Sequence, residues 1–244
     1  MSEFSALDEN EATEAENDGF ELAYERKSVQ GKLIKAEVRA PKAAKACPGI
    51  ELIGHTIRTL VFSTDLYIIR NSNADAVLAA APFTCQPAIT QALLQVSGRP
   101  VLVGVTGATT SGARSVILAM EAESQGASAV MANMTATPEL IGDMAQIVDI
   151  PVVATVGAYD ETVDRKITAG ARIVNVAAGR NTATVVAELR DAYPQLPIIA
   201  TAGPTEETAA AAIKAGADAL SWTPPSCAEL ERETMRRNRE QAGV

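Results

Sequence analysis

The sequence predicts an α/β fold, a (β/α)8 TIM barrel with a disordered acidic N-terminal tail. Three observations support this prediction. The chain has 244 residues, close to the roughly 250 at which such a barrel closes. From residue 59 onward, short apolar runs alternate with stretches of helical periodicity. Within the runs, polar and apolar residues do not alternate, which indicates strands buried on both faces, as in parallel sheets.

The predicted strands are rich in Ala and β-branched residues and are bounded by Gly or Pro. They occupy residues 59–63, 76–80, 100–105, 129–133, 151–155, 172–177, 197–201 and 219–223. Eight such units that alternate with helices favour a sheet closed on itself. The alternative is an open, doubly wound sheet, which usually has a glycine-rich first turn. No such turn follows residue 63.

The signals between the strands repeat in pairs. The third, fifth and seventh strands begin at Pro100, Pro151 and Pro197. The fourth, sixth and eighth strands follow the pairs Gly126-Ala127, Gly170-Ala171 and Gly216-Ala217. A glycine in the left-handed conformation can end a helix. Proline lacks a backbone N–H, but the first residue of a strand does not need this donor for the hydrogen bonds of the sheet.

Helix starts are marked by residues that cap N-termini. The predicted caps are Thr137, Asp160, Asn181 and Ser226. A short helix is predicted over residues 66–70, and an amphipathic last helix with a solvated face over 229–240.

Two segments precede the barrel, which we assign to residues 59–244. Residues 1–19 hold seven acidic residues and no basic one, so they cannot bury enough surface to become ordered. Residues 20–58 do not fit the repeat, and we expect this extension to cap the N-terminal face of the barrel. The only histidine, His55, would then lie on the face that stabilises the barrel, where a structural role is expected.

The composition argues against several partners. A formal net charge of -9 repels polyanions, and 4% aromatic residues leave few rings for stacking bases, so no nucleic-acid partner is expected. Without a secretory signal or a long apolar run, the chain is predicted to be cytoplasmic, with no membrane partner. Cys47, Cys85 and Cys227 show no metal-ligand spacing. We therefore expect no metal and no cofactor, whereas a homo-oligomer is neither predicted nor excluded.

Three candidate catalytic residues follow predicted strands, because the active site of this fold forms at the C-terminal strand ends. Asp65 is either a general base or an acid favoured in the first turn of the short helix. Cys85 is either a low-pKa nucleophile near a helix start or a small buried thiol. Tyr159 acts as an acid, positions the substrate, or is only a packed surface residue.

Two loops, 177–182 and 201–206, are candidate anion sites. They contain Gly179, Arg180, Asn181, Thr201, Gly203 and Thr205. Each loop combines a glycine with hydroxyl or amide side chains at a helix start, where free N–H groups attract anions. Alternatively, these residues only make tight turns and helix caps. The eighth strand is followed by Pro224 and Pro225 rather than by glycine, which removes two donors from a standard phosphate cup.

A set of polar residues recurs at similar heights on successive strands. It comprises Asn133, Thr155, Asn175, Thr201 and Ser221. They either form a polar layer beneath a small-molecule ligand or satisfy one another. After residue 45 the only lysines are Lys166 and Lys214, both inside helical stretches, so a Schiff-base mechanism lacks its nucleophile.

The segments LPIIATAG (196–203) and AAIKAGADA (211–219) resemble the seventh strand, helix and eighth strand of the aldolase-type TIM-barrel superfamily. The resemblance covers residues 59 to about 241 and implies a barrel like those of phosphate-binding lyases, epimerases and synthases. Where the aldolases of this superfamily have a catalytic lysine, this chain has Asn175 or Ala177. The chain is also similar to bacterial barrel proteins described as hydrolases.

These residues together predict a metal-independent, aldolase-like lyase or an isomerase that acts on a small anionic carbonyl metabolite, with or without a phosphate group. Asp65 would move the proton, and the two candidate loops would hold the anion. One alternative is a hydrolase that activates water with Asp65 or attacks with Cys85. The other is a non-catalytic barrel that binds a ligand or a flavin phosphate.

Overall fold

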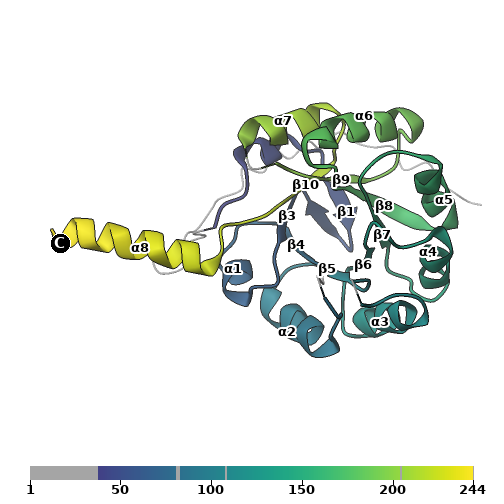
Figure 1. Cartoon of the computed structure of the whole chain (residues 1–244), viewed down its shortest axis with the longest axis horizontal. Helices are drawn as coiled ribbons and strands as arrows, with labels where there is room; N and C mark the ends of the chain where they lie inside the picture. The colour runs from purple at the N-terminus through teal and green to yellow at the C-terminus, as the bar shows by residue number, and fades with distance from the viewer. Residues whose placement is uncertain (1–37, 81–82, 108, 204, 244) are drawn as a thin grey trace, which may run out of the picture. The chain divides into compact units, whose positions relative to one another are not determined.

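The computed structural model describes residues 38–80, 83–107, 109–203 and 205–243. The predicted disordered tail, residues 1–19, and residues 20–37 of the predicted extension lie outside the described residues. The predicted barrel is confirmed: eight parallel strands close into one ring with helices around it (Figure 1). The open-sheet alternative is wrong, because the last strand, β10 (Ala219–Trp222), pairs in parallel with the first, β3 (Thr59–Phe62).

Each barrel strand begins and ends within one residue of its predicted bounds. The strands between β3 and β10 are β4 (Ala76–Ala79), β5 (Val101–Gly104), β6 (Ala129–Ala132), β7 (Val152–Val156), β8 (Ala171–Val176) and β9 (Ile198–Thr201). The helices that follow the strands are α1 (Leu66–Arg70), α2 (Pro87–Ser97), α3 (Ala113–Ser124), α4 (Pro138–Ala145), α5 (Glu161–Ala169), α6 (Thr182–Ala192), α7 (Glu206–Lys214) and α8 (Cys227–Ala242). Two 3-10 turns are η1 (Lys42–Ala46) and η2 (Gly179–Asn181).

Alternate residues of the strands fill the barrel interior. Leu60, Leu78, Leu102 and Met131 belong to one buried cluster contributed by different strands. Their neighbours along each strand point the other way and pack against the helices. Both faces of the strands are therefore buried, which explains why the apolar runs in the sequence do not alternate.

Glycines end the helices as predicted. Gly126, Gly170 and Gly216 have φ values of +96°, +125° and +109°, a region that side chains with a Cβ rarely adopt. Each lies directly after a helix or one residue beyond its C-cap. These positions let the chain leave the helix and turn into the next strand.

All four predicted cap residues lie at the N-cap positions of their helices, and three of them form side-chain capping bonds. The side chains of Thr137, Asp160 and Ser226 accept hydrogen bonds from the first turns of α4, α5 and α8. Asn181 also lies at the N-cap position of its helix, α6, but its side chain makes no capping bond. It ends the 3-10 turn η2, and the hydroxyl of Thr182 instead accepts from the Ala178 amide and donates to the Gly179 carbonyl.

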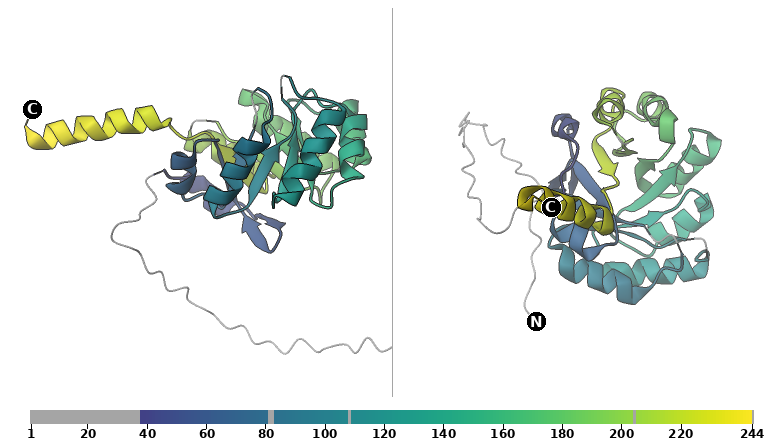
Figure 2. Two further views of the ribbon diagram at one scale, coloured as in Figure 1. Left: turned by 90° about the horizontal axis from the view of Figure 1, so that it is seen from below. Right: turned by 60° about the vertical axis from the view of Figure 1, so that its left-hand side comes forward.

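An antiparallel hairpin closes one end of the barrel. It consists of β1 (Ile50–Leu52) and β2 (His55–Ile57) and extends beyond the barrel strands in Figure 2. Ile50, Leu52 and Ile57 are buried in the same cluster as the interior residues of the barrel strands. His55 is exposed on this hairpin, at the N-terminal end of the strands. Hydrophobic burial thus joins the extension to the barrel core.

The last helix differs from the others, because α8 has no buried residue. Its charged side chains pair along the helix, as in the contacts of Arg236 with Glu233 and Glu240 at 2.7 and 2.6 Å. Such pairs stabilise an exposed helix by only a few tenths of a kcal/mol each. Within the part of the chain that the structure describes, no helix has the length and apolar character needed to cross a bilayer.

Candidate functional site

A small pocket lies at the C-terminal end of the barrel interior, and we call it the mouth pocket. Its volume is about 290 Å³, at the lower limit for small-molecule sites. Its polar lining comprises Thr106, Asn133, Thr155, Asn175, Thr201, Ser221 and Thr223. Its apolar lining includes Phe62, Leu78, Met131 and Met134. Among the described residues, no charged side chain lines the pocket.

Hydrogen bonds connect four of the predicted polar residues across β7 to β10. Ser221 donates from Oγ to Thr201 Oγ1 at 3.2 Å, and Thr201 Oγ1 lies 3.4 Å from Asn175 Oδ1. Asn175 Nδ2 lies 3.5 Å from Thr155 Oγ1. The last two distances are long for hydrogen bonds, so these groups retain hydrogen-bonding capacity for a ligand.

The alternation of side chains explains why these residues meet. Thr155, Asn175 and Ser221 each lie two residues after a barrel-interior residue, namely Val153, Ile173 and Ala219. Side chains two positions apart on a strand point to the same face. The apolar residues fill the barrel below, and the polar layer forms the floor of the pocket above.

Thr106 and Met134, which were not among the predicted site residues, line the other side of the pocket. The hydroxyl of Thr106 accepts a hydrogen bond from the Asn133 amide at 2.6 Å. The buried amine of Lys166 donates to the Met134 carbonyl at 2.9 Å, and burial lowers the pKa of this amine. Lys166 therefore holds the loop after β6 from the helix side. The inward direction of the Thr106 side chain could be predicted from the alternation of residues along the strand. The contact of Lys166 with the loop after β6 could not be predicted, because it joins residues far apart in the sequence.

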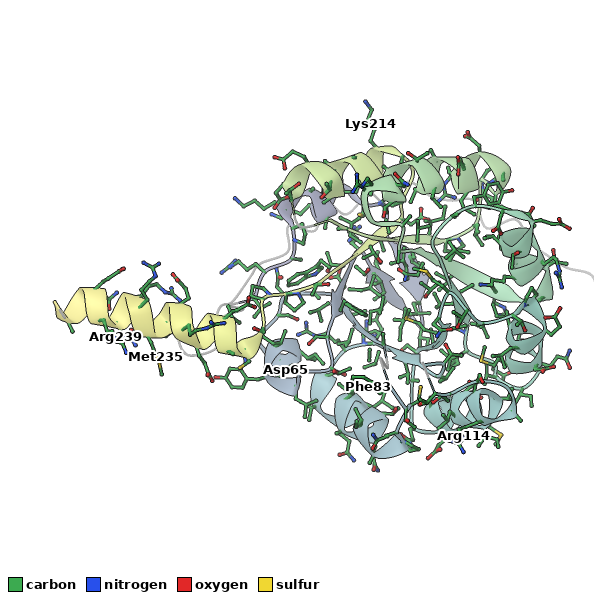
Figure 3. The ribbon with its side chains drawn as sticks, in the orientation of Figure 1. Asp65, Phe83, Arg114, Lys214, Met235 and Arg239 are labelled. Atoms are coloured by element: carbon green, nitrogen blue, oxygen red, sulfur yellow. The ribbon has the colours of Figure 1, made fainter. Side chains whose placement is uncertain are left out.

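The first candidate catalytic residue, Asp65, lies on the rim rather than in the pocket lining. Its Oδ1 accepts hydrogen bonds from the amides of Tyr67 and Ile68 at 2.8 and 3.2 Å, which makes it the N-cap of α1. Figure 3 shows Asp65 between α1 and the start of α8, away from the barrel centre. Its catalytic role stays a prediction that requires Oδ2, the oxygen that does not cap the helix.

The other two candidate catalytic residues also lie outside the pocket lining. Cys85 is buried, and burial raises the pKa of its thiol, which disfavours the thiolate that a nucleophile needs. Its amide donates to Thr110 Oγ1 at 3.2 Å. The nearby Asp164 carboxylate, which accepts a hydrogen bond from the Tyr193 hydroxyl at 2.8 Å, raises the pKa of the Tyr159 phenol. Cys85 and Tyr159 are therefore both packed against neighbouring residues, and their catalytic roles stay predictions.

The candidate anion loop after β8 forms the turn η2. Gly179 has φ +59°, and a Cβ there would meet nothing within 4 Å. Gly179, Arg180 and Asn181 lie at the surface of this turn, with Arg180 and Asn181 exposed. The loop is therefore accessible to a ligand, but only Asn175 and Ala177 from this strand and its end line the mouth pocket.

The candidate anion loop after β9 is divided between two surfaces. Thr201 lines the mouth pocket, whereas Gly203 and Thr205 line a larger groove outside the barrel. A Cβ on Gly203 would lie 2.7 Å from Thr208 Oγ1, so this glycine permits close packing of the loop on α7. Thr205 and Thr208 cap α7 reciprocally, which occupies the donors that an anion would use.

The side chains at the mouth offer no carboxylate or imidazole for a metal ion among the residues that line it. Within the described ranges, no group of three His, Cys, Asp or Glu side chains could share one. Magnesium is usually bound through one or more carboxylates, which the mouth pocket does not supply. The amide and hydroxyl donors instead suit a carbonyl or carboxylate oxygen.

The closed ring of eight parallel strands with helices around it is a (β/α)8 TIM barrel, a fold that it shares with several solved structures. One similar solved structure is a phosphonopyruvate hydrolase in complex with oxalate and Mg²⁺, with a TM-score of 0.59 and 14% identity over 75% of this chain and 82% of that one. A second is 2,3-dimethylmalate lyase, a member of the PEP mutase/isocitrate lyase superfamily. It has a TM-score of 0.59 and 14% identity over 84% of this chain and 87% of that one.

A third similar structure is an HpcH/HpaI aldolase from Desulfitobacterium hafniense DCB-2. Its TM-score is 0.57, with 12% identity over 76% of this chain and 93% of that one. No protein-family model matches this chain, and no curated protein does. At these identities the likeness establishes the common fold, and the chemistry has to be argued from the site itself.

Proposed function

We propose that the protein is a lyase or isomerase that acts on a small anionic carbonyl compound bound in the mouth pocket. The observation that carries this proposal is the uncharged, polar lining of that pocket. Amide and hydroxyl groups cover its β7 to β10 side, and the opposite side combines Thr106 and Asn133 with apolar side chains. A carbonyl compound with few carbon atoms fits the volume of about 290 Å³. A flavin needs more room than this.

The polar layer would act on the oxygen atoms of the substrate. In both bond cleavage and isomerisation next to a carbonyl group, negative charge develops on the carbonyl oxygen. Asn175 Nδ2 and the hydroxyls of Ser221 and Thr201 are oriented donors in a site without competing charges. Donors fixed in a site of low dielectric constant stabilise such charge more than water does.

The proton would be moved by Asp65 at the rim. The structural support is that capping uses only Oδ1 of this carboxylate. Catalytic contacts are often long in the absence of substrate, so the position of Asp65 outside the lining is compatible with this role. The anionic end of the substrate would contact the loop Gly179–Asn181, with Arg180 as a fork-shaped donor.

The similar structures suggest which compounds to test. Oxalate is bound in the phosphonopyruvate hydrolase structure, and the second relative is described as a lyase of 2,3-dimethylmalate. Both compounds are small carboxylates. The first structure also holds Mg²⁺, but the uncharged mouth of the present chain does not fit that ion, so no step here is assigned to a metal.

One observation favours a second candidate function, a barrel that binds a small ligand without catalysis. The described lining of the mouth pocket has no titratable side chain, so a ligand could bind there with no acid or base in contact. A hydrolase has two routes, water activated by Asp65 or attack by Cys85. The Cys85 route has weaker support, because this thiol is buried and its pKa is raised.

Thermal-shift titration of the full chain with oxalate, pyruvate and phosphonopyruvate, each with and without Mg²⁺, tests the proposal. A ligand that binds only the folded state raises the midpoint of unfolding. Asn175→Ala should abolish the shift, whereas Asn238→Ala, which removes the same side chain from exposed α8, should retain it. An unchanged shift in Asn175→Ala would contradict binding in the mouth pocket.

Asp65→Asn separates the two candidate functions once a ligand is known. Asparagine can still cap α1 but cannot take a proton. Loss of turnover with retained binding supports the enzyme. Binding without turnover in the wild-type chain supports the non-catalytic barrel, and unchanged turnover in Asp65→Asn excludes this carboxylate.

A further inference from the structure

A second, larger concavity lies on the outside of the barrel. We call it the outer groove, and it has a volume of about 950 Å³, bounded by η1, the start of α7 and the chain on either side of β3 and β10. Ser221 points into the barrel, so the next residue, Trp222, points outward and lines the groove. Only Thr223, of the described residues, lines both this groove and the mouth pocket.

The outer groove is basic although the whole chain has a formal net charge of -9. Arg39, Lys42, Lys45 and Arg58 all line it. None of them forms an ion pair with another described residue. Like charges around one concavity repel each other, and a bound anion would relieve that repulsion.

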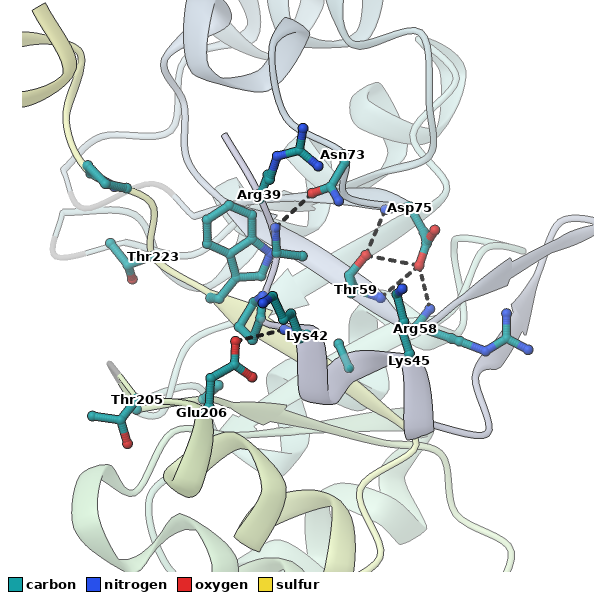
Figure 4. Close-up of a pocket in the computed structure, with 17 residues that line it drawn as sticks. Arg39, Lys42, Lys45, Arg58, Thr59, Asn73, Asp75, Thr205, Glu206 and Thr223 are labelled. Carbon is teal, nitrogen blue, oxygen red and sulfur yellow. Dashed lines mark hydrogen bonds between the residues drawn. The ribbon is translucent and has the colours of Figure 1, made fainter. Parts of the chain in front are cut away.

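The two acidic residues of the groove are already engaged by the protein. Asp75 Oδ2 accepts from the Arg58 amide, the Thr59 amide and the Thr59 hydroxyl at 2.9 to 3.0 Å. Glu206 accepts from the amides of Lys42 and Ala43 at 2.8 and 2.9 Å, and these bonds lower its pKa. Figure 4 shows both sets of bonds at different places along the groove. Arg58 Nε donates to the Cys47 carbonyl at 3.1 Å. Its Nη groups and the charged ends of Arg39, Lys42 and Lys45 form no ion pair with another described residue, so they remain available to a ligand.

Trp222 supplies a separate observation. Its side chain is buried, and its Nε1 has no hydrogen-bond partner among the described residues. Buried donors nearly always have an acceptor, and leaving one unpaired is unfavourable. An oxygen of a ligand in the groove could become that acceptor after a small shift of the ring.

From these observations we infer that the outer groove binds a small, multiply charged anion such as a diphosphate. Arg39, Lys42, Lys45 and Arg58 would contact its oxygens, because guanidinium and ammonium groups are the usual partners of phosphate. Three of these cations come from residues 39–45, which precede the barrel strands. None of these cations lines the mouth pocket, with which the described lining of the groove shares only Thr223, so the inference does not depend on the proposed function.

The single tryptophan of the chain gives a direct measurement, because all indole emission comes from the wall of the groove. Titration of the full chain with inorganic pyrophosphate should change this emission saturably, and added salt should weaken the binding. Citrate, a carboxylate polyanion, shows whether phosphate groups are required or only charge. If neither anion changes the emission nor raises the unfolding midpoint, the inference is wrong.

Charge-removing variants locate the site. Lys42→Gln keeps the backbone amide that binds Glu206, and together with Lys45→Gln it should raise the Kd for pyrophosphate about 100-fold, or about tenfold for each charge removed. Lys214→Gln is the matched control, since Lys214 projects from α7 into solvent (Figure 3) and does not line the groove. Equal weakening in the control variant would show non-specific attraction and overturn the assignment.

Discussion

Arg190 on α6 and Asp218, the residue before β10, form an ion pair in which Nη2 lies 2.6 Å from Oδ2. The same Oδ2 accepts the Ile198 amide at 2.8 Å, so one carboxylate joins a helix and two neighbouring strands. Arg190 also donates to the carbonyls of Gly216 and Leu196. The two side chains are 23% and 22% exposed, which shields their attraction from solvent.

We therefore expect Arg190→Met to lower the free energy of unfolding by about 3 kcal/mol, because it leaves a partly buried carboxylate without its partner. The measurement is urea denaturation. Arg165→Met is the control: Arg165 pairs with Glu139 at 2.7 Å, but the side chains are 57% and 67% exposed. That change should cost less than about 1 kcal/mol. Equal effects would show that burial does not determine the strength of these pairs.

The thiol of Cys47 should make stability depend on pH in alkaline solution. Burial, with Asp218 nearby, raises the pKa of Cys47 from 9.0 to about 11. Below pH 9.0 the thiol is neutral in both the folded and the unfolded state. Between pH 9.0 and about 11 only the unfolded chain ionises, so the free energy of unfolding should fall as pH rises, by about 2 to 3 kcal/mol in total.

Denaturation of the wild-type chain and Cys47→Ala across this pH range isolates the effect of the thiol from that of other groups. Any effect of the substitution on packing is the same at every pH, so the comparison is of slopes. The variant should lose less stability than the wild type between pH 9.0 and 11. Parallel curves would mean that Cys47 ionises equally in both states.

Two glycines should respond to alanine in opposite directions. In Gly203→Ala the new Cβ would lie 2.7 and 3.0 Å from Oγ1 and Cβ of Thr208, a side chain fixed by the cap of α7. We expect destabilisation by about 1 to 3 kcal/mol from overpacking. Gly142 lies inside α4, and a Cβ there would be 3.6 Å or more from its neighbours.

Gly142→Ala should therefore stabilise the protein by about 0.5 to 1 kcal/mol through helix propensity and a smaller loss of backbone entropy. Differential scanning calorimetry of both variants would show this as a lower midpoint for Gly203→Ala and a higher one for Gly142→Ala. A midpoint for Gly203→Ala at or above the wild-type value would mean that the loop after β9 moves easily.

Alkylation rates test the chemical state of Cys85. Cys85 is 8% exposed and has a raised pKa, so iodoacetamide at neutral pH should modify it slowly in the folded protein. Cys227, which is only partly buried at the start of α8, should react first. Peptide mapping by mass spectrometry gives both rates in one sample. Fast, selective modification of Cys85 would restore the nucleophile hypothesis.

The barrel was predictable because its local signals agree with one another. Proline starts, glycine helix ends and apolar runs all indicate the same strand positions, and the observed bounds differ by at most one residue. Asn181 shows the limit of local reasoning. Asparagine favours N-caps, but the competing hydroxyl of Thr182 forms the contacts that fix this turn.

The candidate site was only partly predictable. The polar layer of Asn133, Thr155, Asn175, Thr201 and Ser221 follows from strand position, and all of these residues line the mouth pocket. Asp65, Cys85 and Tyr159 were selected by chemical type, and none of them lines it. Proximity to a strand end gives the height of a residue on the barrel but not the direction of its side chain.

The eight-stranded barrel and the rim that carries its polar residues follow from the amino-acid sequence alone, because strand and helix signals depend on neighbours along the chain. The separation of the uncharged mouth pocket from the basic outer groove became visible in three dimensions. The lining of the outer groove combines residues that are far apart in the sequence, such as Arg39 and Thr223. Their proximity depends on closure of the ring by β3 and β10 and on the packing of η1 against α7, which no local pattern encodes.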